Sequence, residues 1–398
     1  MTVVTCLKPS VCAERLYPHD AAYMARTDLE QMRMTGVKAV TLDAVTALLL
    51  GLLGRRPTVR HRAGVTDEIL ALLDRAGLEI TEDMRVYETF EGAARHADRL
   101  IDEGYRIFSP YPLPKGRIPD RAQLVAPELW ASLNAKQNLH RIVPRENLAP
   151  SRIAALADLT SAAFERPVFL KAGGEAATGA GYAVRYCADE VQWKGALEWF
   201  RSFDDIDRLI VEDAVPHQTC WCVTFVVEPT RTTYIGAAEQ LFSAPGRQSG
   251  SMIDPARPFP RKGRELVIAV GEAARKRGYV GLAGLDVALA DDGGLIVFDP
   301  NFRFNASSTQ VLFHEAAASR DDLAASCSAH AATPLPFETI RRRIEGPIDD
   351  GWFVPTRLLD ARWLPSAEGL SMCTGFVLGK DRREALMRSD AFKALLEV

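Results

Sequence analysis

The sequence lacks the features that mark several large classes of protein. Its 398 residues include no apolar run close to the roughly 18 residues that a membrane span needs. The start has no basic stretch followed by an apolar segment, as a secretory signal would. Lysine and arginine number 48 against 52 acidic residues, for a net charge of −4, so nothing favours a polyanionic partner. We predict a soluble, cytoplasmic protein that binds neither nucleic acid nor membranes.

Cysteine is also used without a recognisable pattern. The seven cysteines are an odd number, lie far apart and never form a CxxC pair, which disfavours a disulfide framework or a zinc site. We expect reduced thiols, several of them buried in strands. The chain likewise has no recognisable Ser/His/Asp or Cys/His signature, so catalysis through a side-chain nucleophile is not indicated.

The length and the 47% hydrophobic content allow two or three packed units. In residues 1–125, short apolar runs alternate with helical patterns, which predicts an α/β unit with a parallel sheet. The predicted strands are 3–7, 37–42, 57–60 and 105–109, and the predicted helices are 66–76 and 92–103. Four prolines between residues 110 and 119 indicate a boundary.

The rest of the chain divides into a larger middle region, 126–332, and a C-terminal α+β segment, 333–398. Two helices are predicted at 127–141 and 150–164, each opened by a proline. The pattern then becomes β-rich, with a small unit at about 165–210 and a second part at 211–332. The turn Asp291-Asp292-Gly293-Gly294 predicts a hairpin between strands 281–290 and 294–299.

A glycine-rich loop joins two of these strands. In FLKAGGEAATGAGYAV, residues 169–184, Lys171 ends an apolar strand and a loop of glycine, alanine and threonine leads to the next strand. Glycines allow backbone N–H groups to approach phosphate oxygens, and the lysine adds a cation. The pattern is neither a P-loop nor a Rossmann fingerprint. Taken alone, it fits a phosphate-binding loop and a plain turn equally well.

Hard oxygen donors occur on the predicted hairpin. Asp286 and Asp299 are 13 positions apart, and Asn301 follows two residues later. On adjacent antiparallel strands these side chains can share one face, because side-chain direction repeats every two residues. Such donors suit Mg²⁺, which binds through a few carboxylates together with substrate phosphates. The alternative is a solvated strand end, but Asp299 ends an apolar run and a buried carboxylate there needs a partner.

Together, and in this order, these elements resemble the ATP-grasp superfamily over about residues 133–308. The resemblance implies an ATP-grasp fold, with a Rossmann-like pre-ATP-grasp domain before it and a lid at 165–210. It implies ATP and two Mg²⁺ ions as cofactors, with Mn²⁺ as an alternative ion. The metal ligands would be Asp286, Asp299 and Asn301. The catalytic residues would be Arg303, which matches an Asn-x-Arg pattern, and Lys171.

The same resemblance assigns the nucleotide contacts. Lys136 and Lys171 would bind phosphates, Glu212 the adenine amino group, and the backbone of Asp213 and Val215 the adenine edge. The loop residues that would cover the phosphates are Gly173, Gly174, Thr178, Gly179 and Gly181. Two departures stand out. Asp299 replaces the usual glutamate, and the acidic ribose ligand is missing where His217, Gln218 and Thr219 stand, which leaves Gln218 as the predicted ribose contact.

A polar segment, residues 243–254, is predicted to be a loop that faces the acceptor. Arg247, Ser249 and Ser251 are its candidate substrate contacts, because arginine can bind a carboxylate through two hydrogen bonds. Arg247 fits a solvated loop arginine at least equally well. Asn305 could hold a reaction intermediate, although we favour a capping role for residues 305–309, through Ser307 or Ser308.

Family members mostly activate a carboxylate with ATP as an acylphosphate, which an amine or thiol then attacks. We therefore predict an ATP-dependent carboxylate–amine ligase that forms an amide or peptide bond and releases ADP and phosphate. Its partners would be a small carboxylate and a small amine, and a homodimer is compatible with the sequence. One alternative is a biotin-carboxylase-like or purine-pathway enzyme that acts on bicarbonate or another small acid. Another is a non-catalytic nucleotide-binding regulator, against which the retained lysines and metal ligands argue.

Overall fold

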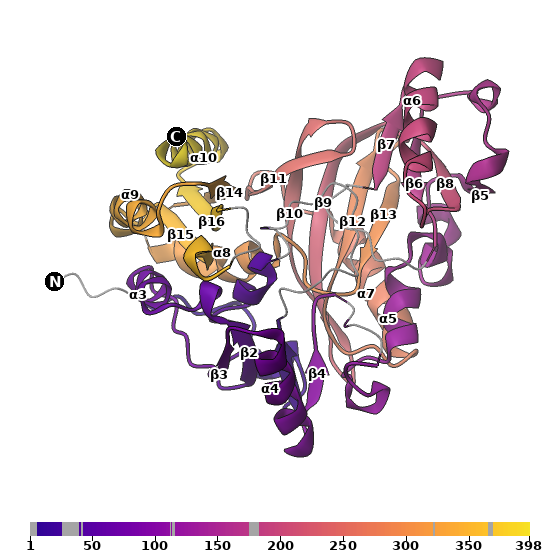
Figure 1. The fold of residues 1–398 in the computed structure, drawn as a ribbon. Helices are drawn as coiled ribbons and strands as arrows, with labels where there is room; N and C mark the ends of the chain where they lie inside the picture. The colour runs from indigo at the N-terminus through magenta and orange to yellow at the C-terminus, as the bar shows by residue number, and fades with distance from the viewer. Residues whose placement is uncertain are drawn as a thin grey trace.

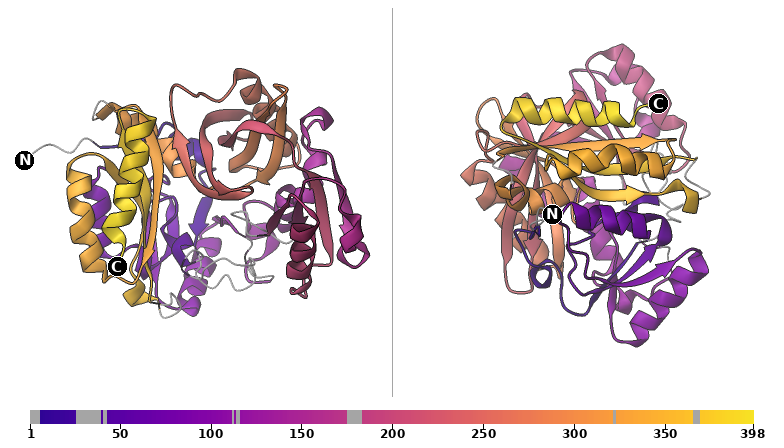
Figure 2. Two further views of the ribbon diagram at one scale, coloured as in Figure 1. Left: turned by 90° about the horizontal axis from the view of Figure 1, so that it is seen from above. Right: turned by 90° about the vertical axis from the view of Figure 1, so that its left-hand side faces the viewer.

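The computed structural model describes residues 6–25, 40, 43–111, 113, 116–174, 183–320, 323–364 and 369–398. These residues form three β-sheets with helices packed on them (Figure 1). The eight-stranded sheet is central. The four-stranded sheet within residues 151–213 and the C-terminal helices lie at opposite ends of the molecule (Figures 1 and 2). In this part of the chain, no helix has the length and apolar character that a bilayer crossing requires.

The N-terminal sheet has four parallel strands in the order β3-β2-β1-β4. Its elements are α1 (Ala13–Leu16), β1 (Ala21–Met24), β2 (Pro57–His61), α3 (Asp67–Arg75), β3 (Asp83–Tyr87), α4 (Phe90–Asp102) and β4 (Arg106–Phe108). The hydroxyls of Thr66 and Thr89 cap α3 and α4 by accepting backbone N–H groups. The parallel α/β prediction is confirmed. The predicted strands 3–7 and 37–42 fall mostly outside the described residues.

The lid is a four-stranded antiparallel sheet in the order β5-β8-β6-β7. Its elements are β5 (Ser151–Ala155), β6 (Val168–Ala172), β7 (Val184–Cys187), α6 (Glu190–Arg201) and β8 (Arg208–Asp213). The helix predicted at 150–164 is wrong, because its first residues form β5. Most of β5 is exposed, so its sequence carries no alternating apolar signal. Pairing with β8, from Ser151 opposite Glu212, decides its conformation.

The central sheet has eight strands in the order β13-β12-β9-β10-β11-β14-β16-β15. The strands are β9 (His217–Val227), β10 (Thr232–Ala244), β11 (Arg247–Ile253), β12 (Gly281–Ala290), β13 (Leu295–Asn301), β14 (Ala325–Thr333), β15 (Phe353–Leu359) and β16 (Ser371–Gly379). The accompanying helices are α5 (Pro127–Asn134), α7 (Arg261–Arg275), α8 (Ser308–Arg320), α9 (Phe337–Asp349) and α10 (Arg382–Leu396).

Three further features differ from the sequence-based expectation. The helix predicted at 127–141 is α5 followed, after an extended Ala135, by a short 3₁₀ helix, Lys136–Arg141. Residues 243–254 are largely strand, because β10 and β11 form a hairpin that turns at Pro245 and Gly246. The C-terminal strands β15 and β16 extend the central sheet through β14. The residue bounds of the three predicted domains stay a prediction.

One continuous core joins the N-terminal unit to the C-terminal elements. Leu73 of α3, Phe313 of α8, Phe337 of α9 and Phe353 of β15 are buried in the same apolar cluster. Burial of large side chains on this scale contributes about 1.5–3 kcal/mol for each of them. The edge strand β15 is thereby held against the N-terminal unit, where it packs on α3 and on the short helix Ala44–Ala47.

Candidate nucleotide and metal site

A cavity of about 500 Å³ lies between the lid and the central sheet. Residues from β6, β8, β9, β10, β12 and β13 line it. Among them are several residues that the sequence predicted for nucleotide and metal binding, namely Lys136, Lys171, Glu212, Asp286 and Asp299. These positions span more than 160 residues of sequence, so the fold alone brings them together.

Lys171 lies at the lid side of this cavity. It is 6% exposed, and its Nζ forms an ion pair of 2.6 Å with Oε1 of Glu212 on the neighbouring strand β8. The same Nζ donates a hydrogen bond of 3.1 Å to the carbonyl oxygen of Phe298 on β13. Lys171 therefore links the lid to the hairpin of β12 and β13, and its charge is positioned for a phosphate that enters between them.

Lys136 and Asp299, which both line the cavity, form a second ion pair. Lys136 begins the 3₁₀ helix after α5, and its Nζ contacts Oδ1 of Asp299. Each of the two lysines thus has one carboxylate partner. A polyphosphate that binds here can exchange these pairs for charge-assisted contacts of its own, so the lysines need not be buried without a counter-charge.

Asp286 and Asp299 lie directly opposite each other on β12 and β13, and Asn301 lies opposite Gly284. This pairing confirms that the hairpin places the predicted donors at neighbouring positions. Burial, and then the negative charge of Asp299, raise the pKa of Asp286 from 3.8 to about 6. Oδ1 of Asp286 is buried without a hydrogen-bond partner among the described residues. Both observations indicate a carboxylate that is short of positive charge.

The donor set fits Mg²⁺. No group of three or more His, Cys, Asp or Glu side chains converges in the part of the chain that the structure describes. Mg²⁺ does not require one, since it keeps water and shares its ligands with substrate phosphates. A cation at Asp286 and Asp299 would satisfy the free oxygen of Asp286 and offset the repulsion between the two carboxylates. Asn301 is 7% exposed and could add an amide oxygen.

The beginning of the glycine-rich loop lies against the 3₁₀ helix that carries Lys136. The N–H of Gly174 donates to Oε1 of Gln137 at 3.2 Å, and Gly174 has a φ of 105°, which favours glycine. The N–H of Gly173 donates to the carbonyl of Arg208. Thr178, Gly179 and Gly181 lie outside the described residues, so their contact with phosphates stays a prediction.

Three of the residues predicted to contact adenine or ribose, Asp213, Val215 and Gln218, do not line the cavity. The Asp213 side chain turns to Arg166 at 2.9 Å, and its N–H donates to the Pro150 carbonyl. The carbonyl of Val215 lies 2.9 Å from Nδ1 of His217. Gln218 is exposed and does not line the cavity, whereas His217 does. His217 is also exposed, and its ring lies 5.6 Å from that of Phe298, centroid to centroid.

The predicted acceptor contacts do not gather at the cavity. Arg247 and Ser249 are exposed residues of β11 that do not line it. Ser251 is 3% exposed, and its hydroxyl donates to Oε1 of Gln310 at 2.7 Å. Asn305 Oδ1 accepts from the N–H of Ser307 and from the hydroxyls of Ser307 and Ser308, at the start of α8. These bonds fix the turn before α8, but their acceptor is the Asn305 side chain and not Ser307 or Ser308, through which the cap was predicted.

Two family models match the chain. Residues 12–131 match the N-terminal domain of L-aspartate–L-methionine ligase, and residues 150–301 match its ATP-grasp domain. The chain belongs to the ATP-grasp superfamily. It is an ATP-dependent ligase that joins a carboxylate to an amine.

Solved structures share the ATP-grasp fold across almost the whole chain. An ADP complex of N5-carboxyaminoimidazole ribonucleotide synthetase has a TM-score of 0.58 at 13% identity, covering 98% of each chain. The biotin carboxylase domain of 2-oxoglutarate carboxylase from Hydrogenobacter thermophilus has a TM-score of 0.55 at 13% identity, covering 94% of this chain and 89% of its own. L-amino acid ligase from Bacillus licheniformis has a TM-score of 0.52 at 11% identity, covering 94% and 96%.

Sequence reasoning missed several residues of the ATP-grasp cavity. Gln240 lines it from β10, and its hydrogen bond lowers the pKa of Asp286 against the effect of burial. Phe169 lines it from the lid, two residues before Lys171 and on the same strand face. Phe298 lies 5.6 Å from Lys171 Nζ, measured to the ring centroid. Of these three residues, only Phe169 could have been found from the local sequence, because side chains two residues apart on a strand lie on the same face.

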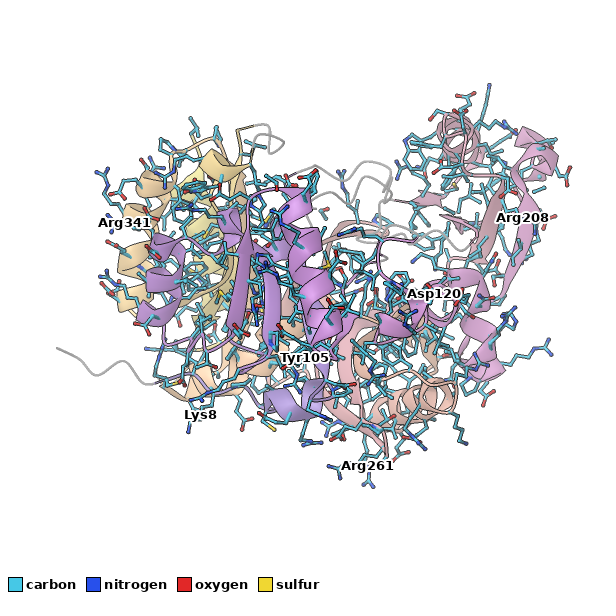
Figure 3. The ribbon with its side chains drawn as sticks, turned by 60° about the horizontal axis from the view of Figure 1, so that its bottom comes forward. Lys8, Tyr105, Asp120, Arg208, Arg261 and Arg341 are labelled. Atoms are coloured by element: carbon cyan, nitrogen blue, oxygen red, sulfur yellow. The ribbon has the colours of Figure 1, made fainter. Side chains whose placement is uncertain are left out.

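A second cavity, of about 420 Å³, lies where the N-terminal sheet meets the end of β13. Its lining is largely aromatic and apolar, and includes Tyr17, Phe108, Trp130, Tyr279, Phe302 and Phe304. Polar groups come from Ser109, Asp120, Glu128 and Arg303. Of these residues, Asp120 is labelled in Figure 3. Arg303 lines this second cavity, whereas Asp299, four residues earlier in the chain, lines the first one.

Proposed function

We propose that this ligase condenses an acidic L-amino acid with an L-amino acid that has an apolar side chain. L-aspartate and L-methionine, which the matching family models name, are the first pair to test. The observation that carries the proposal is the position of the two cavities at the end of β13. Asp299 lines the cavity that suits a nucleotide, and Arg303 lines an aromatic cavity that suits an amino acid.

In this proposal Arg303 holds the carboxylate that is activated, at the border between the two cavities. Lys136 and Lys171 hold the phosphates of ATP and stabilise the charge of the phosphoryl group during transfer. Asp286, Asp299 and Asn301 hold two Mg²⁺ ions, or Mn²⁺ in their place. Bound there, the ions would neutralise phosphate charge. Asp120 and Glu128, at the rim of the aromatic cavity, supply negative charge that suits an ammonium group.

The proposal is tested by incubating the protein with ATP, Mg²⁺, L-aspartate and L-methionine. We expect phosphate release that depends on both amino acids, and a product whose mass equals their sum less one water. Mixtures lacking one amino acid, and a mixture with bicarbonate alone, serve as controls. Phosphate release with bicarbonate alone, or no condensed product from any pair of an acidic and an apolar amino acid, would contradict the proposal.

Two further expectations stay predictions. The described cysteines are all free, which agrees with a reducing compartment such as the cytoplasm. A homodimer is the oligomeric state that we would test first, by light scattering of the purified protein.

A further inference from the structure

The aromatic cavity, of about 420 Å³, has walls made of rings that are packed in pairs. The rings of Tyr17 and Phe108 stack with their centroids 3.9 Å apart, and those of Tyr279 and Phe302 meet edge to face at 5.0 Å. All four residues line the cavity, and each is exposed by 9% or less. Rings packed against each other in this way have little freedom to move, so this part of the cavity wall is apolar and rigid.

One face of α5 completes the cavity. Pro127, Trp130 and Ala131 line it, and their spacing of three and four residues places them on the same side of the helix. Trp130 and Ala131 are only partly buried, unlike the paired rings. This face of α5 therefore has apolar surface that the side chain of a ligand can cover.

Charged groups are few in this cavity, and most of them are negative. Among the described residues that line it, Arg303 is the only cationic one, while Asp120 and Glu128 are acidic and exposed. Arg303 is assigned to the carboxylate that is activated, so no other cation of the described lining faces a carboxylate on a side chain. An acidic side chain in the cavity would lose water without gaining a partner, whereas an apolar side chain has no such cost.

We infer that the aromatic cavity binds the side chain of the apolar amino acid, and that Trp130 and Ala131 determine which side chains it accepts. The inference rests on the proposed function and deepens it, because it assigns one of the two amino acids to this cavity. The volume lies near the lower end of the range of about 300–1,000 Å³ that is common for ligand sites, which suits a single amino acid. A thioether such as that of methionine also makes favourable contacts with aromatic rings.

The test compares Ala131→Leu and Trp130→Ala with wild type, measuring KM and kcat separately for methionine, alanine, aspartate and ATP. Leucine at position 131 takes up space in the cavity, and alanine at position 130 removes most of one wall. We expect kcat/KM for methionine, relative to alanine, to fall at least tenfold in each variant, because each methylene that fits or fails to fit an apolar pocket changes this ratio about tenfold or more. KM for aspartate and for ATP should change less than threefold.

Ala94→Leu is the matched control. Ala94 is also a partly buried residue within a helix, α4, but it does not line the cavity. This variant should keep the wild-type preference for methionine over alanine. An unchanged preference in folded Ala131→Leu would overturn the inference, and so would a rise in KM for aspartate as large as that for methionine. If Ala131→Leu does not fold, an unchanged preference in Trp130→Ala overturns it equally.

Calorimetric titration of methionine and of aspartate, with ADP and Mg²⁺ present, separates this inference from the function itself. If wild type makes no dipeptide but binds methionine, and Ala131→Leu binds it at least tenfold more weakly while binding aspartate as wild type does, the ligase proposal fails and the role of the cavity is supported. Equal binding of methionine by the two proteins contradicts that role.

Discussion

At the scale of single residues, the nucleotide cavity is arranged as two ion pairs and one carboxylate that lacks a partner. Lys171 pairs with Glu212, Lys136 pairs with Asp299, and Asp286 keeps a free buried oxygen. Each lysine has a carboxylate partner within the protein, so its charge is balanced before any ligand binds. Entry of a nucleotide with its metal ions would transfer these charges to phosphate and to metal without a large change in net charge.

Asp299→Asn should abolish ligation with little effect on folding. The amide keeps the size of the side chain but removes the charge that pairs with Lys136 and that would hold a metal ion. We expect product formation to fall at least 100-fold, the order seen when one charge-stabilising group is removed from an active site. Phosphate release and product mass measure this loss, and a thermal melt measures folding.

Asp292→Asn is the matched control for this prediction. Asp292 lies in the turn of the same hairpin, and its Oδ1 accepts the N–H of Gly294, which an asparagine can also do. Activity of this variant should equal that of wild type. Wild-type activity in Asp299→Asn would remove Asp299 from the metal site.

The candidate site could be predicted from sequence where its residues share a local pattern. The turn predicts that Asp286 lies on one strand of a hairpin and Asp299 and Asn301 on the other. A register shift between Asp286 and Val287 then places Asp299 directly opposite Asp286, and the turn alone does not predict this shift. Gln240 could not be found in this way. Its position depends on the order of strands in the sheet, which leaves no signal near the residue itself.

At the scale of elements, the hairpin of β10 and β11 touches the lid. Gly246 lies at its turn with a φ of 71°, and a Cβ built there would lie 3.0 Å from a ring carbon of Phe169 on β6. The hairpin of the central sheet and the lid strand therefore meet at the mouth of the nucleotide cavity. The sequence suggested a substrate loop here, whereas the structure gives a strand pair that supports the lid.

Gly246→Ala should weaken nucleotide binding more than it weakens the fold. The positive φ costs an alanine about 1 kcal/mol, and the added methyl group would displace Phe169. We expect a several-fold rise in KM for ATP, measured by phosphate release. Gly293→Ala is the control, because Gly293 has a φ of 83° and open space around it. That substitution therefore has the cost of a positive φ without a steric clash of the added methyl group. Equal KM values in the two variants would contradict a role for this contact.

Elements with strong local signals were predicted well, and those fixed by distant pairing were not. The helices α3 and α4 have capping side chains and apolar faces within their own sequences, and they lie at the predicted positions. The strand β5 has neither, and its alanines are compatible with a helix. Its hydrogen bonds to β8, more than 50 residues away, override that local preference.

At the scale of the whole molecule, a partly buried histidine makes stability depend on pH. Burial lowers the pKa of His314 from 6.5 to about 4, and the ring lies 2.9 Å from the hydroxyl of Ser326. The unfolded chain therefore takes up a proton near pH 6.5 that the folded chain takes up only near pH 4. The contribution to stability is complete above pH 6.5, is lost as the pH falls through this window, and is constant below it.

We expect this residue to lower the free energy of unfolding by about 3 kcal/mol between pH 7 and pH 4, since each unit of pKa shift corresponds to about 1.4 kcal/mol. Urea unfolding at several pH values measures it. His314→Gln cannot take up the proton, so its stability should decline less over the same window. The difference between the two proteins isolates His314 from carboxylates that titrate at lower pH. Parallel curves for the two proteins would contradict the assignment.

The continuity of the central sheet has a consequence for how the protein can be divided. Because β14, β16 and β15 complete the sheet that begins with β13, a chain cut after residue 332 would expose the remaining eight residues of β14, Ala325 to Ala332, as an unpaired edge. Open edges of this length recruit strands from other molecules. The last 66 residues should therefore not be separable as an independent module, and a truncated chain should be recovered as aggregates, with its other two sheets still formed.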